Sequence, residues 1–168
     1  MMEQWVVLSS RMKTAAAYYA ARLEPEHLKG ADDAGRAVIR KWPTSLFDAP
    51  EIYAFAALWP TWDPEWLEFG SAFVHGENGG KGVMKEIMAE LIGRASGKNL
   101  FFISKDPAIM HLGMQYGFIR MTTSVHPNIL RWAAYAGLTC RIPGTVHELG
   151  WPAPKPGERW LYMRRAKK

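Results

Sequence analysis

Apolar and polar residues alternate in blocks along this chain, and the two longest apolar blocks predict neighbouring strands. Residues 52–59 (IYAFAALW) are continuously apolar and lie between prolines, as in a strand that is buried on both faces. A PTWDP turn leads to residues 66–75 (WLEFGSAFVH), a second long strand, so we expect an antiparallel hairpin. Residues 83–95 carry apolar side chains at helical spacing with Lys and Glu opposite, which predicts a helix with one face on a sheet.

Shorter patterns predict the other elements. Residues 5–9 are predicted as a first strand, and residues 12–23 as a helix that Ser10 caps. Residues 31–41 are predicted as a helix from their acidic first turn, although AVIRKW is equally compatible with a strand. Further strands are predicted at 100–103, 118–125 and 160–164, and further helices at 107–116 and 128–136. Helices that alternate with strands after the hairpin indicate one mixed α/β or α+β sheet.

The segment between the second long strand and the next helix has the composition of an anion site. In FVHGENGGKGVMKE, Gly79, Gly80 and Gly82 lack a Cβ, so the backbone can let a phosphate approach its amides. The helix that follows adds unpaired N–H groups and the positive end of its dipole, and Lys81 and Lys85 add formal charge. The alternative is a glycine-rich turn that binds nothing, and a short glycine motif alone does not decide between the two.

Length and cysteine content narrow the class of protein. The 168 residues fit a single domain, 1–168, which ends in a basic tail at about residues 164–168. The one cysteine, Cys140, cannot form an intramolecular disulfide, which predicts a cytoplasmic protein. The apolar run at residues 5–8 is too short for a signal peptide, and no stretch approaches the roughly 20 apolar residues of a membrane span. We therefore expect no membrane partner.

The net charge of +5 raises the question of a nucleic-acid partner. It comes from 21 Lys and Arg against 16 Asp and Glu, and part of it lies near the end of the chain, in Arg159, Arg164, Arg165, Lys167 and Lys168. A solvated basic terminus explains these charges better than a nucleic-acid groove, because no basic stripe is interleaved with aromatic residues. The histidines lack the spacing of metal ligands, so no metal is expected either.

Two motifs at this spacing resemble the GNAT superfamily of acyl-CoA N-acyltransferases. They are the VHGENGGKGV loop between a strand and a helix, and the DPAIMHLGMQYGF passage from a helix into a strand. The similarity covers residues 52–120. It implies a mixed, mostly antiparallel central sheet that is flanked by helices and splayed between its fourth and fifth strands. It also implies acetyl-CoA as the acyl donor, with direct transfer to an amine of a small molecule or protein.

The resemblance also implies which residues bind coenzyme A. They are Phe73, Val74, His75, Gly79, Gly80, Lys81, Gly82, Val83, Met84, Lys85 and Asp106. The family's loop reads Arg or Gln, two residues, Gly, one residue, then Gly or Ala. Here only Gly82 matches fully, because Gly79 replaces the long polar residue and Met84 replaces the small one. Asp106 is equally well explained as an N-cap before Pro107, which we prefer.

The catalytic residues follow the family less closely. Glu68 on the second long strand is the first choice for the general base, and a position on the solvent face of that strand is an equal alternative. Many family members protonate the leaving thiolate with a Tyr four residues before a Gly-Phe pair, and that position is Gly113 here. His111 and Tyr116 lie on the same predicted helix but point elsewhere, so either would substitute only after local rearrangement.

The favoured function is therefore an acyl-CoA-dependent N-acyltransferase, and two alternatives stay open. One is a GNAT-like module that binds coenzyme A without turnover, as Gly79, Met84 and Gly113 suggest. The other is a relative that modifies nucleic acid, which only the charge supports. Trp59, Trp62, Trp66 and the WPAPKPGE segment are expected to wall the acceptor site, and exposed sheet edges are compatible with a homodimer.

Overall fold

The structure is a computed structural model that describes residues 2–16, 23–43, 51–61, 63–104, 106–120 and 160–166. The elements are α1 (Glu3–Ala16), α2 (Pro25–Asp33), β1 (Ala37–Lys41), β2 (Ile52–Pro60), β3 (Trp66–Val74), a 3-10 helix (Gly76–Asn78), α3 (Val83–Arg94), β4 (Asn99–Ser104), α4 (Pro107–Gln115), β5 (Ile119–Arg120) and β6 (Trp160–Arg164). By their contacts, the residues form two compact units. The first is Met1–Trp59 with Phe69–Arg94, and the second is Pro60–Glu68 with Ala95–Lys168.

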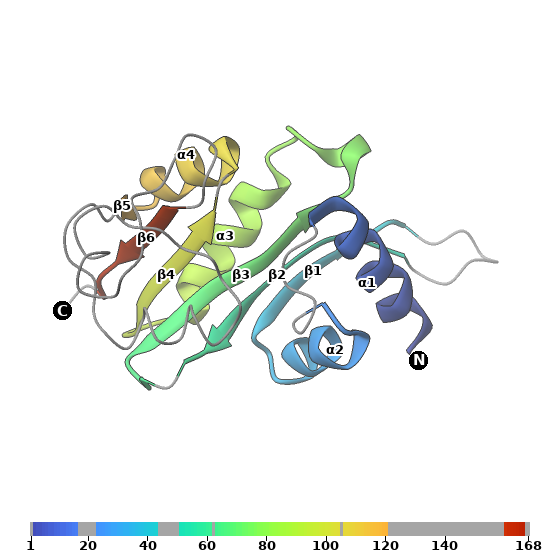
Figure 1. Cartoon of the computed structure of the whole chain (residues 1–168), viewed down its shortest axis with the longest axis horizontal. Coiled ribbons are helices and arrows are strands. Elements are labelled where there is room, and N and C mark those ends of the chain that lie inside the picture. The colour runs from blue at the N-terminus through green and yellow to red at the C-terminus, as the bar shows by residue number, and fades with distance from the viewer. Residues whose placement is uncertain are drawn as a thin grey trace, which may run out of the picture. The chain divides into compact units, whose positions relative to one another are not determined.

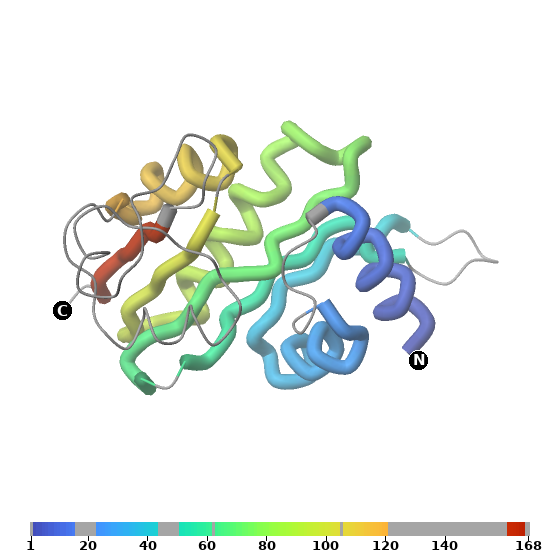
Figure 2. Tube along the Cα trace, in the orientation of Figure 1, coloured from blue at the N-terminus to red at the C-terminus, as the bar shows by residue number. Residues whose placement is uncertain are grey.

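The first unit carries helices on both faces of its strands. Helices α1 and α2 pack together on one face of β1 and β2, and α3 lies on the opposite face (Figure 1 and Figure 2). Strand β1 contacts the helices on both faces of the sheet, because neighbouring side chains of a strand point to opposite faces. Ala37 belongs to the core beneath α1 and α2, whereas Arg40 forms an ion pair with Glu90 of α3.

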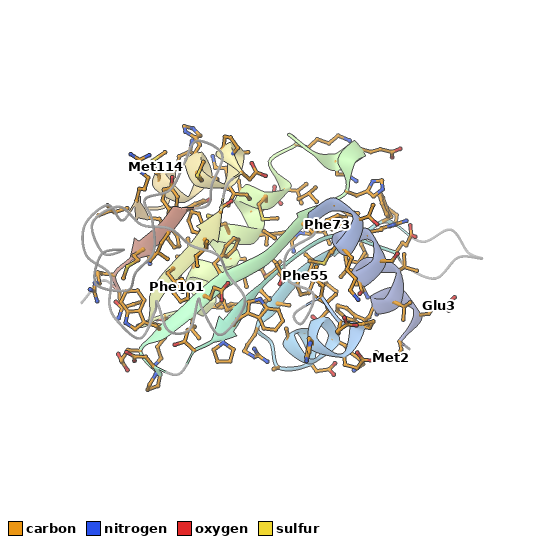
Figure 3. The ribbon with its side chains drawn as sticks, in the orientation of Figure 1. Met2, Glu3, Phe55, Phe73, Phe101 and Met114 are labelled. Carbon is orange, nitrogen blue, oxygen red and sulfur yellow. The ribbon has the colours of Figure 1, made fainter. Side chains whose placement is uncertain are left out.

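The core beneath α1 and α2 is built from side chains of both helices and the strands. Its members are Trp5, Leu8, Met12, Leu23, Leu28, Ala31, Ala37, Ile52, Phe55, Ala57 and Trp59. Trp5 of α1 meets Phe55 of β2 edge to face, with ring centroids 6.3 Å apart. Phe73 of β3 packs against the same cluster, and Figure 3 labels it together with Phe55. The end of β3 that precedes the glycine-rich loop is therefore fixed by the main core of this unit.

The second unit is organised around β4. This strand runs parallel to β3 through three registered pairs, from Trp66↔Asn99 to Glu68↔Phe101, and antiparallel to β6 over five pairs. Strand β5 in turn pairs antiparallel with β6, and α4 contacts both β4 and β5. Phe101 on β4 and Met114 on α4 are labelled in Figure 3.

Aromatic side chains form the centre of the second unit. The ring of Phe102 is stacked on that of Tyr162, with centroids 4.8 Å apart and an interplanar angle of 5°. Phe118 meets Phe102 edge to face at 5.0 Å. Burial raises the pKa of Tyr162 above its ordinary value of 10.0, which the positive charge of Arg120 partly opposes.

The six described strands form one sheet in the order β1-β2-β3-β4-β6-β5. The amide of His75, after β3, donates to the carbonyl of Tyr53, near the start of β2, so these neighbours run antiparallel, as the predicted hairpin requires. The predicted fold class is confirmed, including the splay, since the registered pairs of β3 with β4 end at Glu68.

That first strand, predicted at residues 5–9, is wrong, because these residues lie inside α1. The residues that α1 buries, Trp5, Leu8 and Met12, are three and four positions apart, which is the period of a helix. The short run WVVL has high strand propensity, but burial of this helical face overrides it. Ser10 consequently lies within the helix, where its carbonyl accepts a hydrogen bond from the Thr14 hydroxyl, and it is not the predicted cap.

The helix predicted at residues 31–41 is also wrong over most of its length. Helix α2 ends at Asp33, and Gly35 takes a positive φ of 66° that closes it. Residues 37–41 then form β1, in agreement with the alternative that the AVIRKW sequence left open. The predictions for residues 121–125 and 128–136, and for Cys140, lie outside the described residues. The strands over 52–59, 66–75, 100–103 and 160–164 and the helices over 83–95 and 107–116 are confirmed to within one residue at most ends.

Candidate anion cradle and neighbouring polar residues

The predicted anion site lies wholly in the first unit, where β3 leads through a short loop into α3. A 3-10 turn follows the strand, held by hydrogen bonds from the Asn78 amide to the His75 carbonyl (2.8 Å) and from the Gly79 amide to the Gly76 carbonyl (3.1 Å). The chain then reverses over residues 79–82 and enters α3 at Val83. The loop therefore presents the first turn of α3 beside the end of a buried strand.

Two glycines in this loop adopt a conformation that other residues take only at a cost. Gly80 has a φ of 75° and Gly82 a φ of 80°, both in the left-handed region. An added Cβ would meet nothing within 4 Å at either position, so the backbone conformation itself calls for glycine and the space beside the loop is open. This is the geometry of a loop that brings main-chain amides close to a ligand.

The amides of residues 80–84 form the candidate anion cradle. The first helical hydrogen bond of α3 runs from the Glu86 amide to the Gly82 carbonyl. No backbone carbonyl of the described residues accepts a bond from the amides of residues 80–84, as expected for the start of a helix. These donors and the helix dipole point to the same place, which favours an anion.

Side-chain charge adds little to the cradle. Lys81 and Lys85 are exposed, and so are Glu77 and Glu86 in the same segment, so the formal charges cancel. The attraction for an anion must therefore come from the amides and the dipole. Met84, the second residue of α3, is half-buried at the position where the family has a small residue.

The position of His75 is set by its contacts with Tyr53 and Trp42 of the first unit, and not by the glycine-rich loop that follows it. Its amide donates to the Tyr53 carbonyl at 2.7 Å, so this N–H is not available to a ligand. Its ring meets Trp42 edge to face at 5.2 Å, and its Nδ1 is buried without a hydrogen-bond partner. Trp42 also contacts Tyr53 at 5.2 Å and lies beneath the guanidinium of Arg11 at 5.6 Å. Of the three residues that the resemblance assigned to the strand, His75 offers only its ring and carbonyl.

Ser71, in the middle of β3, was not predicted as a site residue. It has a φ of 54°, whereas every other described residue with a positive φ is a glycine. The residue is 8 % exposed, and its Oγ is buried without a hydrogen-bond partner among the described residues. Gly70 inside a strand pattern was the one sequence signal, because an isolated glycine in a strand often marks a bulge.

Glu68 is one of the few buried polar residues of the described chain. It lies on β3 opposite Phe101 of β4, and only 3 % of its surface is exposed. The alternative that placed it on a solvent face is therefore wrong. A buried carboxyl group must be stabilised by interactions with its neighbours, and Glu68 makes such an interaction.

Helix α4 carries the other predicted site residues. Asp106 accepts a hydrogen bond from the Ala108 amide at 2.8 Å, which confirms the preferred N-cap. His111 is exposed and exchanges a 3.0 Å hydrogen bond with Gln115, one helical turn away. Tyr116 forms the C-terminal cap, and its carbonyl accepts from the Arg164 guanidinium at 2.9 Å.

Gly113 stands where the family has its catalytic tyrosine, and an aromatic ring fills the space that a side chain there would need. A Cβ built at Gly113 would clash with Cε1 and Cζ of Phe102. Phe102 has little freedom to move, because it is itself packed between Tyr162 and Phe118. The ring of Phe102 therefore fills the space that a side chain at position 113 would need.

The basic tail is partly engaged within the second unit. Arg164 bonds to the Tyr116 carbonyl, and the guanidinium of Arg165 lies 4.8 Å from the centroid of the Trp66 ring. Contacts of this kind weaken the case for a free basic arm. Among the described residues, no three His, Cys, Asp or Glu side chains gather as metal ligands, and no helix is both long and apolar enough to cross a membrane.

No protein-family model and no curated protein sequence matches this chain. Solved structures do match it over nearly its whole length. Rv2747 of Mycobacterium tuberculosis, solved in complex with CoA, matches 99 % of this chain and 96 % of its own, with 15 % identity and a TM-score of 0.62. A ribosomal-protein-alanine N-acetyltransferase of Brucella melitensis matches with the same coverage and identity and a TM-score of 0.58.

A third structure, of a Desulfovibrio desulfuricans protein described as belonging to the GNAT family, covers 95 % of this chain and 91 % of its own at 11 % identity, with a TM-score of 0.55. At such low identities these similarities establish the fold. The chain has the fold of the GNAT acetyltransferases, as the two sequence motifs predicted.

Proposed function

We propose that this protein is an acyl-CoA-dependent N-acyltransferase that transfers an acyl group directly to an amine of a small molecule or a protein. The observation that carries the proposal is the cradle, in which Gly80 and Gly82 take left-handed conformations and the amides of residues 80–84 have no backbone acceptor among the described residues. In the GNAT family, a loop between a strand and a helix binds the pyrophosphate of coenzyme A, and the resemblance of this loop to that motif supports the proposal. The lone cysteine and the absence of a patterned basic groove favour a cytoplasmic enzyme whose acceptor is not a nucleic acid.

The residues of the first unit would hold the donor as follows. The amides of residues 80–84 and the dipole of α3 would bind the pyrophosphate. Backbone groups of Phe73 and Val74 would bind the amides of the pantetheine arm, as one strand binds another. Met84 leaves less room at the helix start than the family's small residue, so we expect modest affinity.

Glu68 would accept the proton that the amine loses as its nitrogen attacks the acyl carbon. The support is its burial, because a carboxylate that is 3 % exposed is removed from competing water. The acyl donor supplies a thioester whose leaving thiol has an ordinary pKa of about 8.5, so expulsion does not require a strong acid. The closed position at Gly113 therefore slows the reaction without preventing it.

A second candidate function is a module that binds coenzyme A without turnover. The contact between Gly113 and Phe102 favours it, because no side chain can project from that position of α4. Both functions require the cradle, and they differ in whether Glu68 accepts a proton from an amine.

Calorimetric titration with acetyl-CoA tests the cradle, with adenosine 3′,5′-bisphosphate as the control ligand that lacks pyrophosphate. Acetyl-CoA at a concentration of 100 times its dissociation constant should raise the free energy of unfolding by about 2.7 kcal/mol. The substitution Gly82→Ala forces an L-residue into the left-handed region at a cost of roughly 1–2 kcal/mol, so affinity should fall about tenfold. Gly93→Ala is the matched control, because Gly93 lies on the same helix in open space.

A panel of amines then separates the two functions. Release of free thiol from acetyl-CoA that depends on an amine would establish the transferase, and binding without thiol release would establish the module. Absence of binding by the wild-type protein would exclude both.

A further inference from the structure

Strand β1 is the first in the order of the described sheet, so it has a described neighbouring strand on one side only. In an antiparallel pair, the carbonyls along a strand point alternately toward the partner strand and away from it. The Arg36 carbonyl, just before β1, accepts a 2.8 Å hydrogen bond from the Leu58 amide and therefore points toward β2. The register of β1 with β2 then directs the carbonyls of Ala37 and Ile39 to the open side of β1. An open edge of this kind can pair with a strand of another molecule.

Arginine side chains bind both of the carbonyls on this open side. The Ala37 carbonyl accepts a hydrogen bond from Nη1 of Arg94 at 2.6 Å, and the Ile39 carbonyl accepts one from Nη1 of Arg40 at 3.1 Å. Nη1 of Arg94 also donates to the Gly35 carbonyl at 3.0 Å, just before the strand. Hydrogen bonds with a charged donor are roughly twice as strong as those between neutral groups. A strand that was added here would therefore replace stronger hydrogen bonds with weaker ones.

Glu90 of α3 orients the two arginines. Its Oε1 accepts from Nη2 of Arg94 at 2.6 Å, and its Oε2 accepts from Nη2 of Arg40 at 3.1 Å. Each guanidinium thus gives one nitrogen to Glu90 and another to a carbonyl on the open side of β1. The three side chains are between 31 % and 39 % exposed, so they lie at the surface. We call Arg40, Glu90 and Arg94 the edge guard, and all three belong to the first unit, as β1 does.

We propose that the edge guard keeps β1 from pairing with β1 of a second copy of this chain. Two copies that paired antiparallel about a twofold axis would meet through the same groups, those of Ala37 and Ile39, and both guards would have to move. Each guard carries two guanidiniums against one carboxylate, so two guards that met would also repel each other. Exposed sheet edges alone are compatible with a homodimer, and the guard removes the edge of β1 from the surfaces that could form one.

Sedimentation equilibrium of the full chain tests the proposal with the double variant Arg40→Met/Arg94→Met. Methionine keeps an apolar stem and removes the guanidinium, so the dissociation constant for self-association should be at least about tenfold lower than that of the wild type. The Ala37 and Ile39 amides also point to the open side. Hydrogen exchange followed by NMR should therefore find them exposed in the wild type and protected in the associated variant.

Lys13→Met is the matched control. It removes the same charge from an ion pair of the first unit, because Lys13 on α1 lies 2.8 Å from Glu24. This variant should associate no more than the wild type.

A double variant that folds and associates no more than the wild type would overturn the proposal. Association of that variant without protection of the Ala37 and Ile39 amides would also overturn it, because another surface would then be responsible. A wild-type dimer in which these two amides are protected would show that the guard does not prevent pairing. If the double variant does not fold, the single variants Arg40→Met and Arg94→Met decide. Each frees one carbonyl and should lower the dissociation constant about threefold, and unchanged constants in both would overturn the proposal.

Discussion

The ring of Phe102 lies against Gly113, in the space that any side chain at position 113 would need. Phe102 is stacked on Tyr162 and meets Phe118 edge to face, so the ring is fixed on two sides. Helix α4 approaches β4 closely at this point, and only glycine permits the approach. The contact makes glycine at position 113 part of the packing of the second unit.

We therefore expect Gly113→Ala to destabilise the protein. Alanine is intrinsically the better helix former by about 1 kcal/mol, but the forced overlap with Phe102 should outweigh this gain and leave a net loss of about 1–2 kcal/mol. Gly93→Ala, in open space on α3, should instead gain up to about 1 kcal/mol. Urea denaturation of both variants measures the difference. Equal gains would show that the core around Phe102 is looser than the packing implies.

Much of the fold is readable from the sequence, because the relevant signals are local. The strands β2 and β3 and the helix α3 follow from apolar runs and helical periodicity, and their boundaries agree with the patterns closely. The first part of helix α1 was predicted as a strand because Trp5, Val6 and Val7 resemble a strand until the core that buries Trp5 and Leu8 is known. Tertiary packing makes these residues helical, and a single sequence does not reveal that packing.

The residues of the candidate site also fall into those that the sequence predicts and those that it does not. The cradle was predicted because its glycines and the helix start are contiguous in sequence. The left-handed backbone of Ser71 depends on its neighbours in the sheet, and the contact of Gly113 with Phe102 joins a helix to a strand. For Ser71 the only local signal is the neighbouring Gly70, and the contact of Gly113 with Phe102 has no signature within a short window of sequence. The burial of Glu68 was an open alternative for the same reason, since an alternating pattern does not say which face is covered.

Replacing Met84 should improve the cradle if a phosphate binds there. Met84→Ala restores the small residue of the family's loop and lets an anion approach the helix start more closely. An interaction with the helix terminus is worth about 0.3–1 kcal/mol, so affinity for coenzyme A should rise about two- to fivefold. Met114→Ala, at a methionine of α4 that is 52 % exposed, is the control. Calorimetric titration that gives weaker binding for Met84→Ala would show that the thioether contacts the ligand favourably.

The ion pairs of Glu90 should make stability depend on pH. The hydrogen bond from Arg40 and the bonds and charge of Arg94 hold the pKa of Glu90 below its ordinary value of 4.5, although desolvation opposes them. The two guanidiniums lie 3.1 Å and 2.6 Å from its carboxylate. Because the folded pKa is lowered, the stabilisation is complete above pH 4.5. It is lost as the pH falls through the lowered value.

Glu90→Gln isolates this contribution. The carboxylate is 38 % exposed, so screening by solvent keeps the loss at neutral pH below about 1 kcal/mol. The gap between the wild-type and variant free energies of unfolding should close below the lowered pKa, where both side chains are neutral. It should also narrow in 1 M salt. Urea titrations across the acid range measure it, and a gap that stays constant with pH would assign the effect to packing.

Glu68 and Glu65 provide a matched pair for the catalytic step. Glu68 is buried on β3, whereas Glu65 is exposed at the turn before the strand and lies 3.4 Å from Lys98. Glu68→Gln keeps the shape of the side chain but cannot accept the amine's proton, so kcat/KM should fall by about 10²–10⁴-fold while coenzyme A binds as before. Glu65→Gln should leave the rate unchanged. Wild-type turnover by Glu68→Gln would assign the base to another group, and weakened coenzyme binding in that variant would assign Glu68 a structural role.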